Sequence, residues 1–95
     1  MEIVHETKMK AICPNEGHVN NYTVKIRVDT FIEVEYITEL LESYLHTRIF
    51  QEDLTSELRI KLLKICKEYY RSRPRGFIML KGKHLGIMIT SKEVL

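Results

Sequence analysis

Apolar and polar residues alternate in two stretches in the first third of the chain. Residues 7–12 and residues 22–28 both show a period of two. Such a period places successive side chains on opposite faces, which is typical of half-buried strands. The segment between them contains Cys13-Pro14 and Gly17, which are turn residues, so we expect the two strands to form a hairpin.

Helical spacing replaces this alternation in the middle of the chain. Apolar residues between positions 37 and 45 predict a short amphipathic helix, and an apolar stripe from 54 to 69 predicts a longer one. Asp53 or Ser56 could cap the start of the longer helix. Arg73-Pro74 is expected to end it, because proline lacks an N–H donor and disfavours helix in the residue before it.

Two further strand-like runs, at 77–80 and 85–90, complete the pattern. Residues 81–84 join them, and Gly82 indicates a hairpin turn there. The order strand, strand, helix, helix, strand, strand predicts one α+β domain over residues 1–95, with a four-stranded antiparallel sheet and both helices on one face. The open edges of such a sheet would pair between subunits and close them into a ring-shaped barrel, or two stacked rings.

Composition is that of a small globular protein. The chain has 95 residues, 44% of them hydrophobic, so burial of surface in a homo-oligomer would help its modest core. No apolar run approaches the roughly 18 residues of a membrane span, and the first residues do not resemble a signal peptide. Two cysteines without an export signal are expected to be reduced, and we expect a cytoplasmic protein.

The net charge is only +2, but basic residues concentrate in the C-terminal part. Residues 59–95 contain ten basic and two acidic residues, whereas residues 1–58 contain five basic and eleven acidic ones. A basic region can bind a polyanion such as tRNA. The basic residues of the longer helix are interpreted as a solvated face. Those that follow it are candidates for contacts with RNA: Arg71, Arg73, Arg75, Lys81 and Lys83.

Cys13 is the candidate nucleophile. It lies where a predicted strand meets a turn, so its thiol can project from the sheet edge, and a thiolate is a good nucleophile. The alternative is a small buried hydrophobic residue, which is our interpretation of Cys66 on the apolar stripe of the longer helix. His18 and Asn20 are close to Cys13 in sequence and could orient or protonate a bound group. No ligand spacing indicates a metal site.

Glu52 lies at the opening of the longer helix, directly after Phe50-Gln51. The helix dipole favours a carboxylate there, so its role can be purely structural. Alternatively, a carboxylate can accept two hydrogen bonds from adjacent N–H groups of a guanine-like or pterin-like ring. Phe50 could then stack on that ring.

Together these residues resemble the tunnelling-fold family, and within it the branch related to QueF, the nitrile reductase that acts on 7-cyano-7-deazaguanine. The ββααββ order matches over nearly the whole chain. Three short motifs carry the resemblance: Cys13-Pro14 with Gly17, Glu35, and Phe50-Gln51-Glu52-Asp53. The resemblance implies that Cys13 is the nucleophile and that Glu52 anchors the deazaguanine ring. The other residues expected around the substrate are Gln51, Phe50, Glu35 and His18.

One departure from the reductases narrows the expected reaction. Their first helix continues with a Glu-Ser-Lys-Ser motif that serves NADPH, whereas this chain has Glu35-Tyr36-Ile37-Thr38. A short form without that motif resembles the archaeal QueF-like amidinotransferases. These use no cofactor and add ammonia to the nitrile of 7-cyano-7-deazaguanine in tRNA, which gives archaeosine. The resemblance implies that modified tRNA is the partner, that ammonia is the nitrogen donor and that Cys13 forms a thioimide.

Asn20 is a second departure, at a catalytic position. The family usually has aspartate there as proton donor to the nitrile nitrogen, and asparagine cannot deliver a carboxylic proton. The sequence leaves open whether His18 or a water replaces it, whether the protein is slow, or whether the asparagine is an introduced substitution.

The leading hypothesis is an archaeosine-forming amidinotransferase. The alternatives are a nitrile reductase, a non-catalytic module that binds tRNA or a purine-like or pterin-like base, and an oligomeric structural protein in which Cys13 is inert.

Overall fold

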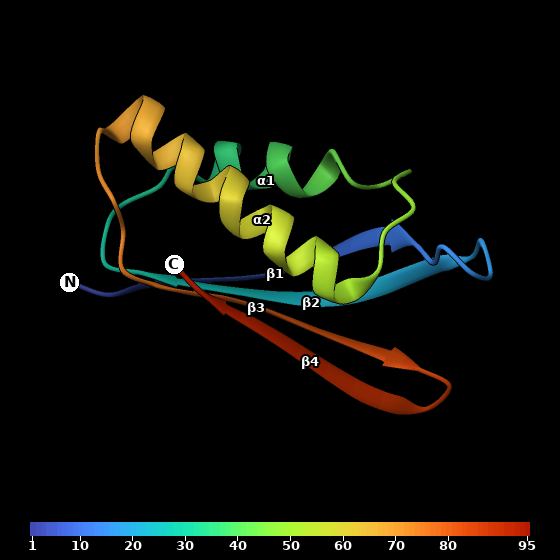
Figure 1. Cartoon of the computed structure of the whole chain (residues 1–95). Coiled ribbons are helices and arrows are strands. Elements are labelled where there is room, and N and C mark those ends of the chain that lie inside the picture. Colours follow the sequence, from blue (N-terminus) through green and yellow to red (C-terminus); the bar gives the residue numbers. More distant parts are fainter.

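The computed structural model describes all residues from Met1 to Leu95. Four strands form one antiparallel sheet in the order β1-β2-β3-β4, and two helices cover one face of it (Figure 1). A π-helical turn, η1, continues the second helix. The predicted α+β class and ββααββ order are confirmed. The elements are β1 (Ile3–Ile12), β2 (Val19–Val28), α1 (Val34–Glu42), α2 (Gln51–Ile65), η1 (Cys66–Tyr70), β3 (Gly76–His84) and β4 (Ile87–Val94).

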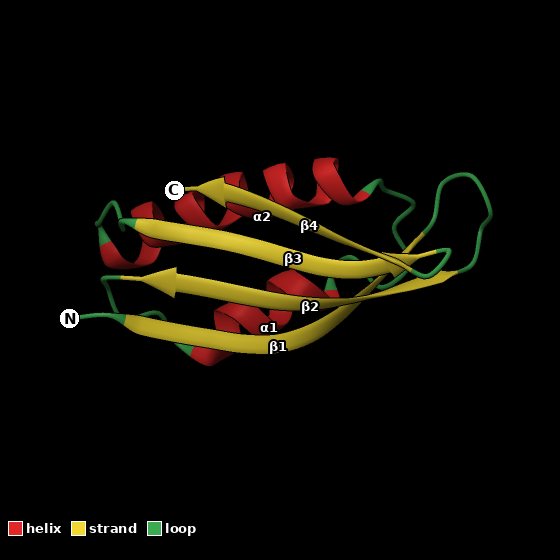
Figure 2. Cartoon of the chain, turned by 90° about the horizontal axis from the view of Figure 1, so that it is seen from below, coloured by secondary structure: helices red, strands yellow, loops and turns green.

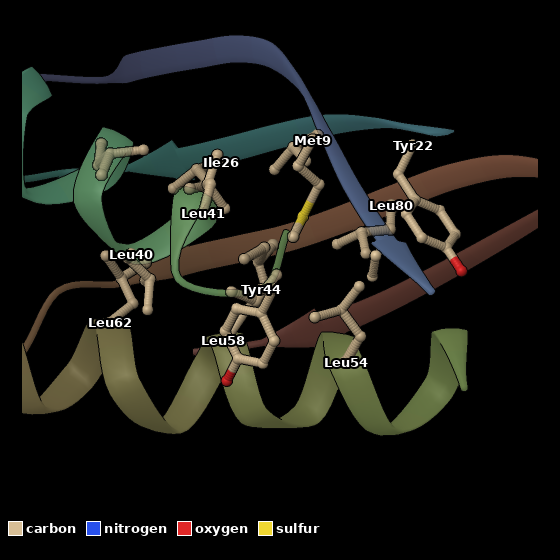
Figure 3. Close-up of a cluster of buried hydrophobic side chains, with 14 of the residues drawn as sticks. Met9, Tyr22, Ile26, Leu40, Leu41, Tyr44, Leu54, Leu58, Leu62 and Leu80 are labelled. Carbon is tan, nitrogen blue, oxygen red and sulfur yellow. The ribbon is translucent and has the colours of Figure 1, made fainter. Parts of the chain in front are cut away.

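The core lies between the helices and the covered face of the sheet (Figure 3). β2 completely buries Val24 and Ile26, two residues apart on one face of the strand. α2 adds a row of leucines four residues apart, Leu54, Leu58 and Leu62, each of them 0% exposed. A fully buried aliphatic side chain stabilises the folded state by about 1.5–3 kcal/mol, so this row anchors α2 on the sheet.

The turn between β3 and β4 consists of Leu85-Gly86. The prediction of a turn at residues 81–84 is therefore wrong, because β3 extends to His84. Both turn residues have positive φ, 50° and 79°, as a two-residue type I′ hairpin requires. Gly82 instead lies inside β3, opposite Tyr22 of β2. A Cβ at Gly82 would lie 2.7 Å from Tyr22 Cδ1, so the ring occupies the space that any larger residue needs.

The longer helix starts earlier than its apolar stripe predicted. α2 begins at Gln51, and Phe50 is the N-cap without a side-chain hydrogen bond. The capping roles predicted for Asp53 and Ser56 are therefore wrong. Asp53 instead places a negative charge in the first turn, where the helix dipole favours it.

The end of this helix is also earlier than predicted. After η1, Arg71 adopts the left-handed conformation with φ 49° and ψ 39°, two residues before Arg73-Pro74. This conformation turns the chain away from the helix axis, and for a residue other than glycine it costs about 1–2 kcal/mol. Arg71, rather than the proline, therefore ends the helix.

Strand β4 is attached to α2 by hydrogen bonds. Ser91 Oγ lies 3.0 Å from Gln51 Nε2 and 2.7 Å from Thr55 Oγ1. The next residue of the helix, Ser56, donates from Oγ to Glu93 Oε1 at 2.9 Å. No residue of β4 belongs to the buried core, so polar contacts hold this strand against the helix.

β1 and β4 are the edges of the sheet, and neither has a partner strand on its outer side (Figure 2). The face of the sheet turned away from the helices is uncovered. Ile87, Met88 and Val94 of β4 are 66%, 52% and 67% exposed. None of the helices is both long and apolar enough to cross a membrane.

Replacement of Gly82 by alanine is expected to destabilise the protein by about 1–3 kcal/mol, because the methyl group would overlap the buried ring of Tyr22. Chemical denaturation followed by circular dichroism measures this loss. Lys83→Ala, at the next position of the same strand with an exposed side chain, should stay within about 0.5 kcal/mol of the parent. Equal midpoints for Gly82→Ala and the parent would contradict the packing of Tyr22 on Gly82.

Candidate functional site

A pocket of about 170 Å³ opens between the Cys13 loop, the first turn of α2 and the β3–β4 hairpin. No group of three His, Cys, Asp or Glu side chains is placed to hold a metal ion, here or elsewhere in the chain. Five of the residues predicted for the site line the pocket: Cys13, Asn20, Phe50, Gln51 and Glu52.

A main-chain crossing brings the distant parts of the pocket together. Ile12 N donates to Thr47 O at 2.9 Å, and Ile49 N donates to Ile12 O at 3.1 Å. The segment before α2 therefore runs along the end of β1 as a short parallel bridge. Since Cys13 follows Ile12 and Phe50 follows Ile49, this pairing places the thiol and the start of α2 at one pocket.

The main chain holds Cys13 in a defined position. Its N–H donates to His18 O, and its carbonyl accepts from Gly17 N, both at 2.9 Å. Gly17 has a φ of 74°, which favours glycine, and it closes the loop. Cys13 is only 5% exposed, so a reagent reaches its thiol through the pocket. Cys66 is fully buried in the core, and burial raises the pKa of its thiol.

Tyr22 places a phenol group at the pocket. Asn20 Nδ2 donates a hydrogen bond to Tyr22 Oη at 3.3 Å, which leaves the phenol hydrogen free to be donated elsewhere. Burial raises the pKa of Tyr22; the hydrogen bond from Asn20 opposes this shift, and the nearby Cys13 and Glu52 add to it. Tyr22 is therefore protonated at neutral pH, and its hydroxyl hydrogen is available for a further hydrogen bond.

Three further residues line the pocket that the sequence pattern does not assign to a site: Tyr22, His84 and Ile89. Tyr22 follows the apolar alternation of its strand and was interpreted as half-buried strand. The sequence does contain an indication that Tyr22 belongs to the site. Residues two positions apart on a strand share a face, and Asn20, a predicted site residue, is two positions before Tyr22. His84 had been assigned to the turn, and it joins the pocket because the turn lies beyond it, at Leu85-Gly86.

The amide of Gln51 ties α2 to the hairpin. Its Nε2 lies 3.2 Å from Leu80 O, 3.0 Å from Ile89 O and 3.0 Å from Ser91 Oγ. These acceptors occupy the amide hydrogens, so Oε1 is the atom that Gln51 can offer to a ligand. Glu52 is exposed in the first turn of α2, where the helix dipole stabilises its carboxylate.

Two other predicted substrate contacts lie outside the pocket. His18 Nδ1 is 3.0 Å from Glu16 Oε2, and both side chains are exposed. Glu35 is exposed in the first turn of α1. Within one chain neither residue lines the pocket, and their roles stay predictions.

The five residues predicted to contact RNA fall on separate surfaces. Arg71 and Arg73 line a second cavity at the C-terminal end of the long helix. Lys81 and Lys83 are exposed positions of β3 that alternate with buried ones, so they face the uncovered side of the sheet. Arg75 borders a third pocket, near the start of β3.

The chain has the ββααββ tunnelling fold. The chain is similar to a solved structure described as the archaeosine synthase QueF-Like in the apo form, with a TM-score of 0.84 and 18% identity. The similarity covers 98% of this chain and 91% of that one, and at this identity it shows a shared fold. Neither a protein-family model nor a curated protein sequence matches the chain.

Proposed function

We propose that the protein is an amidinotransferase that adds ammonia to the nitrile of 7-cyano-7-deazaguanine in tRNA and so forms archaeosine. The observation that carries this proposal is the meeting of Cys13 and Glu52, far apart in the sequence, in one pocket. The shared fold with an archaeosine synthase supports it. Such an enzyme would act in the cytoplasm, where tRNA is available.

The reaction uses Cys13 as a nucleophile that is regenerated. Its thiolate adds to the nitrile carbon, a C–S bond forms, one π bond of the nitrile breaks, and the nitrogen takes a proton to give a thioimide. Ammonia then adds to the same carbon. The C–S bond breaks, the thiol is released as leaving group, and the product is a formamidine. No electrons are transferred, so this sequence of steps needs no reductant.

Glu52 would hold the ring so that the nitrile faces the thiol. Its two carboxylate oxygens can accept hydrogen bonds from the two adjacent N–H groups of a guanine-like ring, and charge-assisted bonds of this kind are strong. Phe50 is 43% exposed beside it and offers an apolar face to the ring. Because Gln51 is bound to the hairpin, the first turn of α2, which carries Glu52, is fixed relative to the pocket.

We further propose that Tyr22 supplies the proton that the family usually takes from aspartate at the position of Asn20. The phenol hydrogen is free, and the pocket that holds Cys13 also contains Tyr22. When the proton leaves, Asn20 Nδ2 is already in place to donate to the phenolate. The amide thus keeps a role at the catalytic position without being an acid itself.

A ring of subunits is the assembly that we propose for this chain. Neither edge strand has a partner strand, and only the end of β1 at Ile12 is paired, with the segment before α2; pairing of β4 with β1 of a neighbour would cover the rest of both edges. Leu95 N donates inward to Gly76 O. Because N–H groups alternate in direction along a strand, the N–H of Thr90 points to the outer edge.

Thr90→Pro removes this N–H, so the mass measured by light scattering should fall to that of smaller species while the circular dichroism spectrum is unchanged. An unchanged mass would refute this edge pairing.

Incubation with 7-cyano-7-deazaguanine is expected to increase the intact mass of the protein by the mass of one whole base, because the addition expels no atom. Cys66→Ser should still form the adduct, and Cys13→Ser should not. An unchanged mass of the parent at saturating base and neutral pH would refute the thioimide.

The same assay tests whether Glu52 binds the deazaguanine ring. Glu52→Ala should raise the concentration of base needed for half-maximal adduct by about 10-fold to 100-fold, the effect of losing hydrogen bonds to a charged group. Its denaturation midpoint should match that of the parent, since the side chain is exposed. Full adduct formation at the parent's concentrations would remove Glu52 from the site.

Tyr22→Phe should slow adduct formation by about 10²-fold to 10⁴-fold, the usual contribution of a positioned general acid. Tyr44→Phe is the matched control, since it removes another buried hydroxyl, which is bonded to Glu57 away from the pocket. Asn20→Asp in the Tyr22→Phe background should restore part of the rate. Adduct formation by Tyr22→Phe at the parent's rate would show that the proton comes from elsewhere.

A further inference from the structure

A second cavity, of about 570 Å³, lies at the opposite end of the long helix from the Cys13 pocket. It contains four cationic side chains and no carboxylate. We call it the basic cleft, and its lining residues are Arg59, Leu63, Lys67, Arg71, Ser72 and Arg73.

Two features place these residues on one surface: their spacing along the helix and the left-handed residue that ends it. Arg59, Leu63 and Lys67 are spaced by four residues, so they lie along one face of the helix. The left-handed conformation of Arg71 then ends the helix and returns the chain toward that face, where Ser72 N donates to Cys66 O at 3.2 Å.

The cationic groups of the cleft are not neutralised within the chain, and one of them is held by a main-chain contact. Arg59 Nε donates to the main-chain oxygen of Val94 at 2.7 Å, which orients the guanidinium and leaves its terminal N–H groups free. None of the four cationic side chains of the cleft forms an ion pair within the chain. Four like charges around one cavity repel each other, so an anion bound among them would be favourable.

Ser72 gives a second and independent indication of a ligand. Its Oγ is buried and has no hydrogen-bond partner in the protein. A buried hydroxyl without a partner is unfavourable. Ser72 lines the cleft, and rotation of its side chain would bring Oγ to a ligand oxygen there, which would accept its hydrogen bond. One hydroxyl donor among several guanidinium and ammonium groups is a set of donors suited to phosphate oxygens.

We infer that the basic cleft binds backbone phosphates of an RNA strand. This inference rests on the proposed function and specifies its substrate. The cleft extends along the helix from Arg59, seven positions from Glu52, to Lys67, fifteen positions from it, which at 1.5 Å per residue is about 10 Å and 22 Å. A free base in the Cys13 pocket cannot reach the cleft, whereas a polynucleotide that extends beyond the modified nucleotide contacts both. The substrate is therefore selected as RNA by a site remote from the chemistry.

The test compares tRNA with the free base on the same variants. Arg71→Gly with Arg73→Gln removes two charges, and glycine suits the left-handed position, so the double variant should fold. We expect its affinity for tRNA to fall about tenfold or more and the slope of log affinity against log salt to decrease by about two. Adduct formation with free 7-cyano-7-deazaguanine should be unchanged, because the base does not touch the cleft.

Two control variants separate the effect of the cleft from a general loss of positive charge and from a loss of stability. Lys8→Ala with Lys64→Ala removes the same charge from exposed positions that do not line it, and should leave the affinity for tRNA within about twofold of the parent. Ser72→Ala should weaken tRNA binding without lowering the denaturation midpoint, because it removes a hydroxyl that the free protein leaves unpartnered.

The outcomes separate this inference from the proposed function. Parental tRNA affinity and salt slope in the Arg71→Gly/Arg73→Gln variant would overturn the cleft as an RNA site, even if the free base still forms the adduct. Loss of tRNA binding in this variant alone would support the cleft, even if the parent forms no adduct. Binding of inorganic pyrophosphate to the cleft by a protein that does not bind tRNA would overturn the inference in favour of a small anion.

Discussion

The amide of Gln51 is the contact on which the arrangement of the pocket depends. Its Nε2 reaches carbonyls of two neighbouring strands and the hydroxyl of Ser91, so the first turn of α2 and the β3–β4 hairpin move together. Gln51 is half-buried, and a typical hydrogen bond of this kind contributes about 0.5–1.5 kcal/mol, so its strength as a clamp comes from several contacts made by one amide. Glu52 comes next along the helix, and its position relative to Cys13 follows from this clamp and from the pairing of Ile12 with the segment before α2.

The order of the elements could be predicted because burial of one face produces the apolar period from which strands and helices are recognised. The ends of the helices and strands could not be predicted, because contacts between residues far apart in the sequence determine them. Gly82 has the local signature of a turn, yet it is a glycine inside a strand because the ring of Tyr22 lies over it. The start of α2 follows from main-chain pairing with Ile12 rather than from a capping side chain, and no local pattern reveals that pairing.

Only part of the candidate site could be predicted, because contacts between residues far apart in the sequence also form the site. Cys13 and Glu52 came from a resemblance between short motifs, and the structure places them at one pocket. Tyr22 was missed because one side chain has two functions, with its ring packed on Gly82 and its hydroxyl at the pocket. The basic residues that follow α2 look like one cluster in sequence. A left-handed residue and the alternation of β3 distribute them over different surfaces.

The continuous helix from Gln51 to Tyr70, made of α2 and η1, fixes the distance and the relative orientation of its two ends. Each residue adds 1.5 Å of length and turns the next by about 100°. Insertion or deletion of a single residue in its middle would leave every side chain of both ends intact and still swing one end out of line with the other. The relative orientation of the two ends therefore depends on the number of residues between them as well as on their identity.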